Sequence, residues 1–393
     1  MVQIRAIMTQ LLKEYNARFI EMTENYRSSS HLVDFANVLA NGIAGRMKTN
    51  PIVSMNRKEG AVLIRNHVSN MMYRPLVDDL LRHRHTGSTC ILTQTNEEAV
   101  ILVALLRKYG LNSRLVQNMD GFRFYNMAEV RMFLKQVDRA GQTPIIPEDV
   151  WEKAKQKTFA VYANSSSLNY LQRCIYLFEQ TNKVKYYTDF KEFIFESSIE
   201  DFCDISGADV VVSTIHKAKG REFDDVYMLI AQPKNIQNNE MRRYYVGATR
   251  AKERLFIHTD SSLFDRMPAD EHLVCQEHYG MPDEIVLQLS HRDVNLGFFK
   301  TRKNEILALR AGQMLRFENN YLYELGSNNA LAQLSQKMRD ELQVWAEKNY
   351  NVVSASIRFI VAWRPKDAMP EENEHAVLLV DLMLKKEERL PIQ

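Results

Sequence analysis

With 393 residues, the chain is too long for one ordinary hydrophobic core and suits two or three domains. Hydrophobic residues make up 45% and charged residues 25%, values typical of a globular protein and not of a disordered or fibrous one. The formal net charge of +2 excludes a basic field over the whole surface, so a polyanionic partner needs a local groove.

The four cysteines lie far apart in the sequence without a C-x-x-C pair, and the ten histidines contain no H-x-x-x-H pair. These spacings argue against a metal site and a disulfide framework, and they fit a reducing compartment. No apolar run reaches the length of a membrane span, and the first residues form a charged amphipathic pattern instead of a signal peptide. We therefore expect a cytoplasmic protein that is not embedded in a membrane.

Residues 1–20 carry apolar side chains at helical spacing, which predicts an amphipathic helix before the first motif, Asn25–Ser28. A chain that opens on such a helix is expected to begin at a domain boundary. A serine cluster then offers N-caps for a helix from about His31. The apolar face of that helix contains Leu32, Phe35, Ala36, Leu39 and Ile43.

Short apolar runs and helices alternate after this point. Helices are predicted at 76–81 and 97–109. Strands are predicted at 61–65, 89–93, 113–116, 208–213, 225–230 and 254–258. Strands separated by helices of this length indicate an α/β fold, a parallel sheet built from βαβ units with helices on both faces.

Two segments depart from this alternation. Residues 126–198 predict consecutive helices, broken around 141–147, as an insertion into the sheet domain. Beyond Pro268 and Pro282, a small α+β unit is predicted, with strands at 314–317, 321–324, 356–363 and 376–384 and a helix at 331–348. We thus divide the chain into a sheet domain (1–125 and 199–265), a helical insertion (126–198) and a C-terminal α+β domain (285–393).

The stretch Thr214–Phe223, TIHKAKGREF, lies between two predicted strands. Thr214 and His216 stand at the carboxyl end of a strand, the edge where open α/β sheets bind ligands. Gly220 permits a tight loop with close backbone approach, and Glu222 leads into the next strand. The ordinary alternative is a strand–loop–strand with a buried histidine and a surface glutamate.

The stretch Arg242–Ala251, RRYYVGATRA, is predicted on a helix from about Asn238 to Ala251. Arg250 is a planar, always charged hydrogen-bond donor near the end of this stretch. The ordinary alternative makes Arg250 a helix-end cation favoured by the helix dipole.

Together with Asn25–Ser28, these two stretches resemble three ordered motifs of the superfamily 1 DNA helicases of the UvrD/Rep/PcrA type. The resemblance implies the second RecA-like lobe of a P-loop NTPase motor. It implies that Tyr26 stacks on adenine, and that Arg27 and Arg250 contact phosphates. Glu222, beyond Gly220, would touch the ribose, and Thr214 and His216 would approach single-stranded DNA. For the first motif, the alternative is a tyrosine packed under the sheet and an arginine in a surface salt bridge.

The sequence contains no G-x-x-x-x-G-K-[ST] loop, and no Asp-Glu pair closes an apolar strand. The resemblance therefore implies ATP with Mg²⁺ only in a complete two-lobe motor, and no tight binding by this chain alone. The implied partners are single-stranded DNA and an N-terminal RecA-like lobe, on the same polypeptide or a separate chain. The full motor would unwind DNA 3′ to 5′, as in DNA repair.

Two alternatives stay open: a non-enzymatic DNA-binding or regulatory protein that retains half a motor, or a piece of a longer polypeptide. A further segment, Leu92–Glu97, is similar to a family strand end that carries arginine where this chain has Gln94, and neither Gln94 nor Arg243 is given a role. Aromatic residues at 122–125 and 186–195 suit either base stacking or a core. Lys300–Lys303 suits either phosphate contacts or a solvated face.

Overall fold

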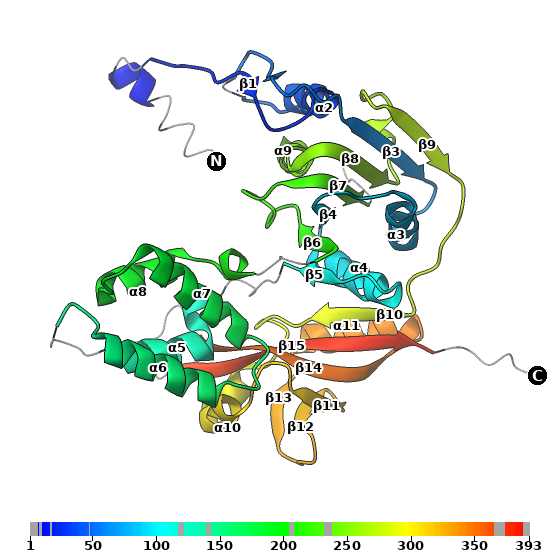
Figure 1. Cartoon of the computed structure of the whole chain (residues 1–393). Coiled ribbons are helices and arrows are strands. Elements are labelled where there is room, and N and C mark those ends of the chain that lie inside the picture. Colours follow the sequence, from blue (N-terminus) through cyan, green and yellow to red (C-terminus); the bar gives the residue numbers. More distant parts are fainter. Residues whose placement is uncertain are drawn as a thin grey trace, which may run out of the picture. The chain divides into compact units, whose positions relative to one another are not determined.

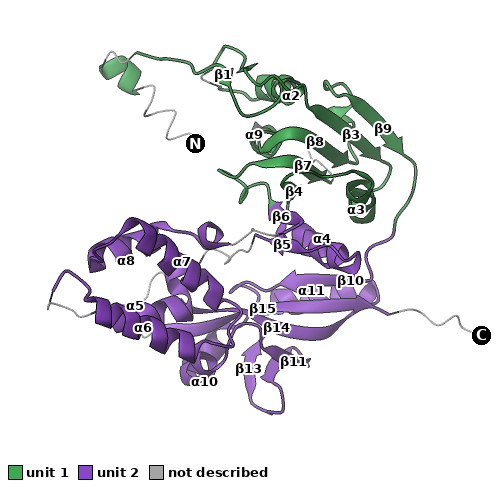
Figure 2. Ribbon diagram, viewed as in Figure 1, with its two compact units in different colours: residues 1–94, 214–279 green, residues 95–213, 280–393 purple. Residues whose placement is uncertain are grey.

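The computed structural model describes residues 7, 10–15, 18–46, 48–116, 122–138, 143–203, 208–231, 238–364 and 374–387. The chain forms two compact units, residues 1–94 with 214–279 and residues 95–213 with 280–393 (Figure 2). Of the helix predicted over 1–20, residues 10–14 are helical, and much of the rest lies outside the described residues. The three-way domain division drawn from the sequence stays a prediction.

The first unit contributes five of the seven strands of the parallel sheet, in the order β4-β7-β8-β3-β9 (Figure 1). These strands are β3 (Ala61–His67), β4 (Thr89–Thr93), β7 (Phe223–Ile230), β8 (Ala251–Thr259) and β9 (Glu271–Cys275). The helices are α2 (Ser30–Asn41), α3 (Tyr73–Arg82) and α9 (Asn238–Ala248), with a short turn η3 (Ser262–Phe264). A two-residue strand β1 (Glu24–Asn25) pairs in parallel with β2 (Val53–Ser54).

The connections explain why helices cover both faces of this sheet. The β3-α3-β4 and β7-α9-β8 units run across the sheet in opposite directions. Because such crossovers are right-handed, their helices lie on opposite faces. The central strands are buried almost throughout, as expected for a parallel sheet covered on both sides. The predicted α/β fold with a RecA-like parallel sheet is confirmed.

The second unit contains the other two parallel strands, a helical segment and an antiparallel sheet. Strands β5 (Ser113–Leu115) and β6 (Val210–Thr214) pair in parallel, and α4 (Asn96–Lys108) precedes β5. The helical segment comprises η1 (Phe124–Asn126), α5 (Ala128–Val137), α6 (Glu148–Val161), α7 (Leu168–Thr181), α8 (Tyr187–Glu196) and η2 (Ile199–Phe202). The predicted helical character of this segment is therefore confirmed.

The antiparallel sheet has six strands in the order β10-β15-β14-β11-β12-β13. They are β10 (Glu284–Gln288), β11 (Met314–Glu318), β12 (Tyr321–Glu324), β13 (Ala330–Gln333), β14 (Tyr350–Trp363) and β15 (His375–Lys386). Helices η4 (Leu296–Thr301), α10 (Lys303–Ala308) and α11 (Gln336–Glu347) belong to the same part. The predicted C-terminal α+β fold is confirmed.

Three sequence predictions were wrong in detail. The helix predicted from Leu331 begins only at Gln336, because residues 330–333 form strand β13 and Ser335 caps the helix by accepting from Met338 N. The helix predicted to reach Ala251 ends at Ala248. Strands β9 and β10 were not predicted. The exposed side chains of β9 lack the alternation of a half-buried strand, so its sequence gives no periodic signal.

The aromatic residues of the helical segment form mainly a core. Trp151, Phe178 and Phe190 are buried, with ring centroids 4.9–6.0 Å apart. Tyr125 and Phe195 stack on each other at 4.3 Å beside a hollow of about 690 Å³. Burial of rings at this spacing supports the core interpretation over base stacking for most of them. Lys300 and Lys303 are exposed, as a solvated face requires.

A polar chain lies inside the first unit. His67 Nε2 lies 3.0 Å from His258 Nδ1, and His258 Nε2 lies 3.2 Å from Asp79 Oδ2. Arg65 Nε lies 3.4 Å from the same carboxylate. Burial, and then the neighbouring His258, lower the pKa of His67 to about 4 from its ordinary 6.5. Burial also lowers the pKa of His258. Both imidazoles are therefore neutral at pH 7 in the folded protein.

This chain predicts acid lability of the first unit. The unfolded state takes up protons near pH 6.5, whereas folded His67 does so only near pH 4, so stability is full above pH 6.5 and is lost as the pH falls towards 4. The slope is up to about 1.4 kcal/mol per pH unit for each group. Hydrogen exchange of β3 and β8 amides, corrected for intrinsic rates, measures it. His67→Gln should flatten the fall and His278→Gln, at an exposed position, should not; equal slopes in both would contradict the prediction.

Candidate functional site

The sheet brings the three predicted motifs together at the amino ends of β7 and β8. Three backbone carbonyls at the start of β8 are the acceptors. Arg250 O accepts from Phe223 N at 2.9 Å. Ala251 O accepts from the Ser28 hydroxyl at 2.9 Å, and Lys252 O accepts from Ser29 N at 2.9 Å. The loop of the first motif and the end of TIHKAKGREF are thus both fastened to the turn that carries Arg250.

Arg27 is positioned by a local turn. Asn25 Oδ1 accepts from the backbone N–H groups of Arg27 and Ser28 at 2.9 and 2.8 Å, an Asx-turn. Asn56 Nδ2 donates to Arg27 O at 3.2 Å. The guanidinium then pairs with Glu222, Nη2 to Oε1, at 2.7 Å, with both side chains roughly two-fifths exposed. The surface salt bridge that we weighed as the alternative for Arg27 is therefore present in the structure.

Arg250 does not stand on the helix, as the sequence predicted, but in the turn between α9 and β8. The helix ends at Ala248 because the backbone that follows it pairs with β7: Arg250 O accepts from Phe223 N, and Ala251 is in register with Phe223. The half-buried guanidinium donates from Nε to Val246 O at 2.9 Å, and from Nη1 to Arg221 O at 3.2 Å. It also donates from Nη2 to the Thr249 hydroxyl at 3.1 Å.

These contacts leave Arg250 with unused donors. A guanidinium has five N–H bonds, and three are engaged, so each terminal nitrogen keeps one. Burial, and then the nearby Arg27, lower the pKa of Arg250, while Glu222 opposes this shift. The cluster of Arg27, Arg250 and Glu222 carries one uncompensated positive charge. An anion placed beside it would relieve the repulsion between the two cations.

Two other predicted residues border this cluster. Tyr26 is 71% exposed and is tied down through its hydroxyl by Glu24, so its ring is open to a flat partner and is not packed under the sheet. Gly220 has φ +87°, in the left-handed region that favours glycine, and nothing lies within 4 Å of an added Cβ. The backbone conformation, not a close approach, requires glycine there.

Thr214 and His216 lie at the other edge of the sheet. Ile215 N, between them, donates at 2.9 Å to the carbonyl of Thr93, the last residue of β4. That is the carboxyl end of a strand, as predicted, whereas Glu222 and Arg250 flank the amino ends of strands parallel to β4. Thr214 is buried and His216 is exposed, so the alternative with a buried histidine is wrong.

Arg243 and Gln94, which the sequence left without a role, are joined at this carboxyl edge. Arg243 Nη2 donates to Gln94 Oε1 at 2.8 Å, and Gln94 Nε2 donates to Ala231 O, just beyond β7, at 2.9 Å. Arg243 comes from α9, whose helical spacing was visible in the sequence. Its partner at the end of β4 was not, because the pairing is between segments far apart in the chain. Arg243 thus places a cation at the edge that carries Thr214.

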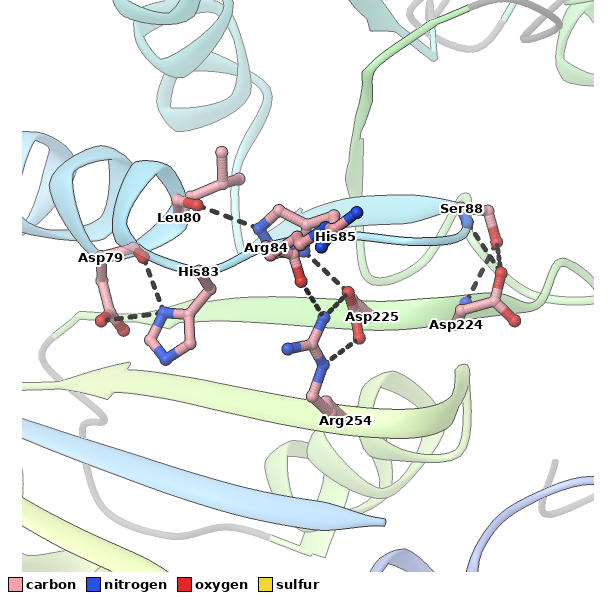
Figure 3. Close-up of polar contacts among 9 residues, drawn as sticks. All are labelled: Asp79, Leu80, His83, Arg84, His85, Ser88, Asp224, Asp225 and Arg254. Carbon is pink, nitrogen blue, oxygen red and sulfur yellow. Dashed lines mark hydrogen bonds and ion pairs between the residues drawn. The ribbon is translucent and has the colours of Figure 1, made fainter. Parts of the chain in front are cut away.

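A second network supports the amino edge (Figure 3). Asp225 accepts from His85 Nδ1 at 2.7 Å and pairs with Arg254 through Nε at 2.7 Å. Asp224 accepts hydrogen bonds from the backbone N–H and the hydroxyl of Ser88, each at 2.7 Å. Burial by itself would raise the pKa of Asp224, but these bonds and the ion pair with Lys252 lower it to about 2. Both carboxylates are therefore engaged in contacts that connect the starts of β4, β7 and β8.

No group of His, Cys, Asp or Glu in the described ranges is arranged to hold a metal ion. Within the same ranges, no helix has the length and apolarity needed to cross a bilayer.

The chain belongs to the UvrD-like helicase C-terminal domain family, whose model matches residues 20–140 and 145–262, more than half of its length. This confirms the resemblance carried by the three motifs and indicates a helicase-related role with a nucleic-acid partner. Among solved structures, the chain is similar to the C-terminal domain of a possible DNA helicase from Lactobacillus plantarum WCFS1. That match has 14% identity and a TM-score of 0.32, and it covers 63% of this chain and 98% of the other. Comparison with curated proteins gives no match.

The site geometry predicts unequal structural costs for the two arginines. Arg250→Ala removes charged hydrogen bonds to two backbone carbonyls and should lower stability by roughly 1.5–3 kcal/mol. Arg27→Ala removes one exposed ion pair and should cost within about 0.5 kcal/mol. Hydrogen exchange over α9 and the start of β8 measures both, with Arg266→Ala, at an exposed arginine in the same unit, as control. Equal losses in the two variants would show that Arg250 does not fasten this turn.

Proposed function

We propose that the chain is the second motor lobe of an ATP-dependent DNA helicase, and that it supplies Arg27 and Arg250 to an ATP cleft. The carrying observation is the convergence of Arg27, Glu222 and Arg250 around one uncompensated positive charge. A nucleoside triphosphate fits this donor set, because its terminal phosphates are anionic and accept planar, bidentate donors.

The residues divide the work by their positions. Arg250, held by three acceptors, keeps two N–H bonds for charge that develops on the terminal phosphoryl group, the part played by an arginine finger. Arg27 contributes a second phosphate contact. The Glu222 carboxylate is about 37% exposed and can accept from a ribose hydroxyl. The exposed ring of Tyr26 provides a stacking surface for adenine.

The opposite edge suits a DNA strand. His216 is exposed there and Thr214 is the last residue of β6. Arg243, whose Nη2 lies 3.8 Å from Glu240 Oε1, is about one-third exposed and places a guanidinium at the same edge. Phosphate contacts of this kind hold a single strand without reading its sequence. Placing the two functions on opposite edges of one rigid sheet allows lobe closure on the nucleotide to move the strand contact as a body.

The missing parts define the partner. ATP hydrolysis needs a phosphate-binding loop and a magnesium carboxylate, and this sequence contains neither motif. We propose that a second RecA-like lobe, fused or separate, supplies both, with ATP and Mg²⁺ bound only between the lobes. A non-enzymatic DNA-binding or regulatory protein is the competing proposal, favoured by that same absence. A phosphate loop encoded upstream in the same reading frame would decide between them.

The chain alone should hydrolyse ATP no faster than buffer, and adding the complementary lobe should give DNA-stimulated hydrolysis. In that assembly, Arg250→Ala should lower turnover on the order of 10³-fold, with much less effect on nucleotide affinity, because the charge it meets develops in the transition state. Arg250→Lys should restore little. Steady-state turnover and equilibrium nucleotide binding are measured side by side, with Arg266→Ala as control. Equal losses in binding and turnover would make Arg250 a ground-state anchor instead.

The chain should bind single-stranded DNA weakly and with little sequence preference. Thr214→Ala with His216→Ala should weaken binding, and Arg243→Gln should reduce the dependence of log affinity on log salt by about one unit. Fluorescence anisotropy of a labelled oligonucleotide at several salt concentrations measures both effects, with Arg266→Gln as the charge-matched control. Unchanged binding in all variants would place the strand contact outside this edge.

A further inference from the structure

A polar cavity of about 390 Å³ lies within the second unit, the purple part of Figure 2, which contains none of the three sequence motifs. Its walls are strand β5 with the end of α4, the first turn of α7, and strands β14 and β15. Three arginines, Arg107, Arg114 and Arg358, line it against one carboxylate, that of Asp381. The cavity therefore has an excess of positive charge that is separate from the cluster of Arg27, Arg250 and Glu222.

The three arginines are not equally engaged. Arg358 is 6% exposed and is fixed by Asp381 at 2.8 Å and by the carbonyl of Leu289 at 2.9 Å. Arg107 and Arg114 are exposed, and their guanidinium groups make no ion pair or hydrogen bond with any other described residue. Two planar cations with unused N–H bonds therefore stand beside a third that is held rigidly.

A buried hydroxyl in the same wall lacks a partner. Ser113, at the start of β5, is 6% exposed, and its Oγ makes no hydrogen bond within the described structure. Buried polar atoms in folded proteins are nearly always satisfied by protein, water or ligand, so a hydroxyl without a protein partner in a cavity wall is available to a bound group. Ser113 can donate to an anionic oxygen or accept from water.

The first turn of α7 adds donors to the opposite wall. Ser166, Ser167 and Asn169 line the cavity, and Ser167 occupies the N-cap of this 14-residue helix without capping it. Its hydroxyl donates instead to Glu129 at 2.6 Å. The helix has no side-chain cap; Leu168 N and Tyr170 N donate to the carbonyls of Ser165 and Ser167, each at 3.2 Å, which leaves Asn169 N as the donor of the first turn at an end where a negative charge is favoured.

We propose that this cavity binds a phosphate ester through Arg107, Arg114, the Ser113 hydroxyl and the amino end of α7. Paired guanidinium forks match phosphate oxygens, and the two positive charges in excess match a phosphate better than a single carboxylate. The volume exceeds that of a phosphate group and admits an attached sugar. Burial raises the pKa of Tyr170, so its phenol in the cavity wall stays protonated and able to donate.

The phosphate ester has two sources, a free nucleotide or a nucleic-acid strand. The probes that separate them are inorganic phosphate, a nucleoside monophosphate, and matched single-stranded oligonucleotides with and without a 5′-phosphate. Inhibition of oligonucleotide binding by the small probes, with preference for the 5′-phosphate, assigns a nucleotide or strand end. Binding of both oligonucleotides alike, without competition by the small probes but weakened by Arg107→Gln with Arg114→Gln, assigns an internal phosphodiester at this cavity; the same binding unchanged in that double variant places the strand at the Thr214–His216 edge instead and overturns the proposal.

The test compares two double variants of the full chain by binding of these probes. Arg107→Gln with Arg114→Gln should lower the affinity for the phosphate probe on the order of tenfold or more per arginine, because each substitution removes a charged hydrogen bond. Lys157→Gln with Lys183→Gln removes the same charge from exposed positions of the same unit and should change binding little. Equal affinities in the two double variants, or no phosphate probe bound by the unaltered chain, would overturn the proposal.

The variant Ser113→Ala provides a second test, because its effect on the melting temperature would have the opposite sign if Ser113 only stabilised the fold. Without ligand, removing an unsatisfied hydroxyl should leave the melting temperature unchanged or raise it. With saturating phosphate ester, the ligand-induced rise in melting temperature should shrink. A lowered melting temperature with the ligand-induced rise intact would contradict the assignment. Because Arg250 and His216 lie in the other unit, neither result depends on the proposed motor function.

Discussion

The candidate site depends on one constraint: the backbone at the start of β8 accepts hydrogen bonds from two other motifs. Arg250 O, Ala251 O and Lys252 O bind Phe223 N, the Ser28 hydroxyl and Ser29 N. Because these acceptors are consecutive, a register shift of one residue in β8 would move Arg250 away from Arg27 and Glu222. The network around Asp225 and Arg254 resists such a shift by tying β8 to β4 and β7 a few residues further on. The register of β8 therefore determines the geometry of the candidate site.

Parallel strands also explain why the predicted residues fall into two groups. Each βα connection returns the chain to the amino edge, so a motif that spans one connection contributes to both edges. TIHKAKGREF does this: Thr214 closes one strand and Glu222 precedes the next. In α9, Arg243 lies near the carboxyl edge and the turn after the helix carries Arg250 to the amino edge. A rigid sheet would therefore couple the proposed phosphate contact to the proposed strand contact through two short segments.

Much of the fold was predictable because its signals are local. The strands from Ala61 to Thr259 are mostly apolar runs, α2 and α4 carry periodic apolar faces, and Thr95 caps α4. Errors arose where tertiary pairing decides. Residues 330–333 have a helix-forming composition but form a strand that pairs with β12. Ala251 was predicted in the helix but pairs with β7 in the sheet. The site was predictable from motif order, but not the Arg243–Gln94 pair or the Ser113 cavity, which join segments that no sequence pattern links.

Electrostatics explains how a nearly neutral chain can have polyanionic ligands. The buried or partly buried cations of the described chain include several that pair with an acid: Arg254 with Asp225, Lys185 with Glu148, Arg358 with Asp381. Such pairs cancel at a distance, so a net charge of +2 says little about any single surface. The proposed sites use a few guanidinium groups whose N–H bonds are only partly engaged, Arg250 in one unit and Arg107 and Arg114 in the other. Binding strength at each place follows from the desolvation and alignment of those few donors, not from the charge of the whole chain.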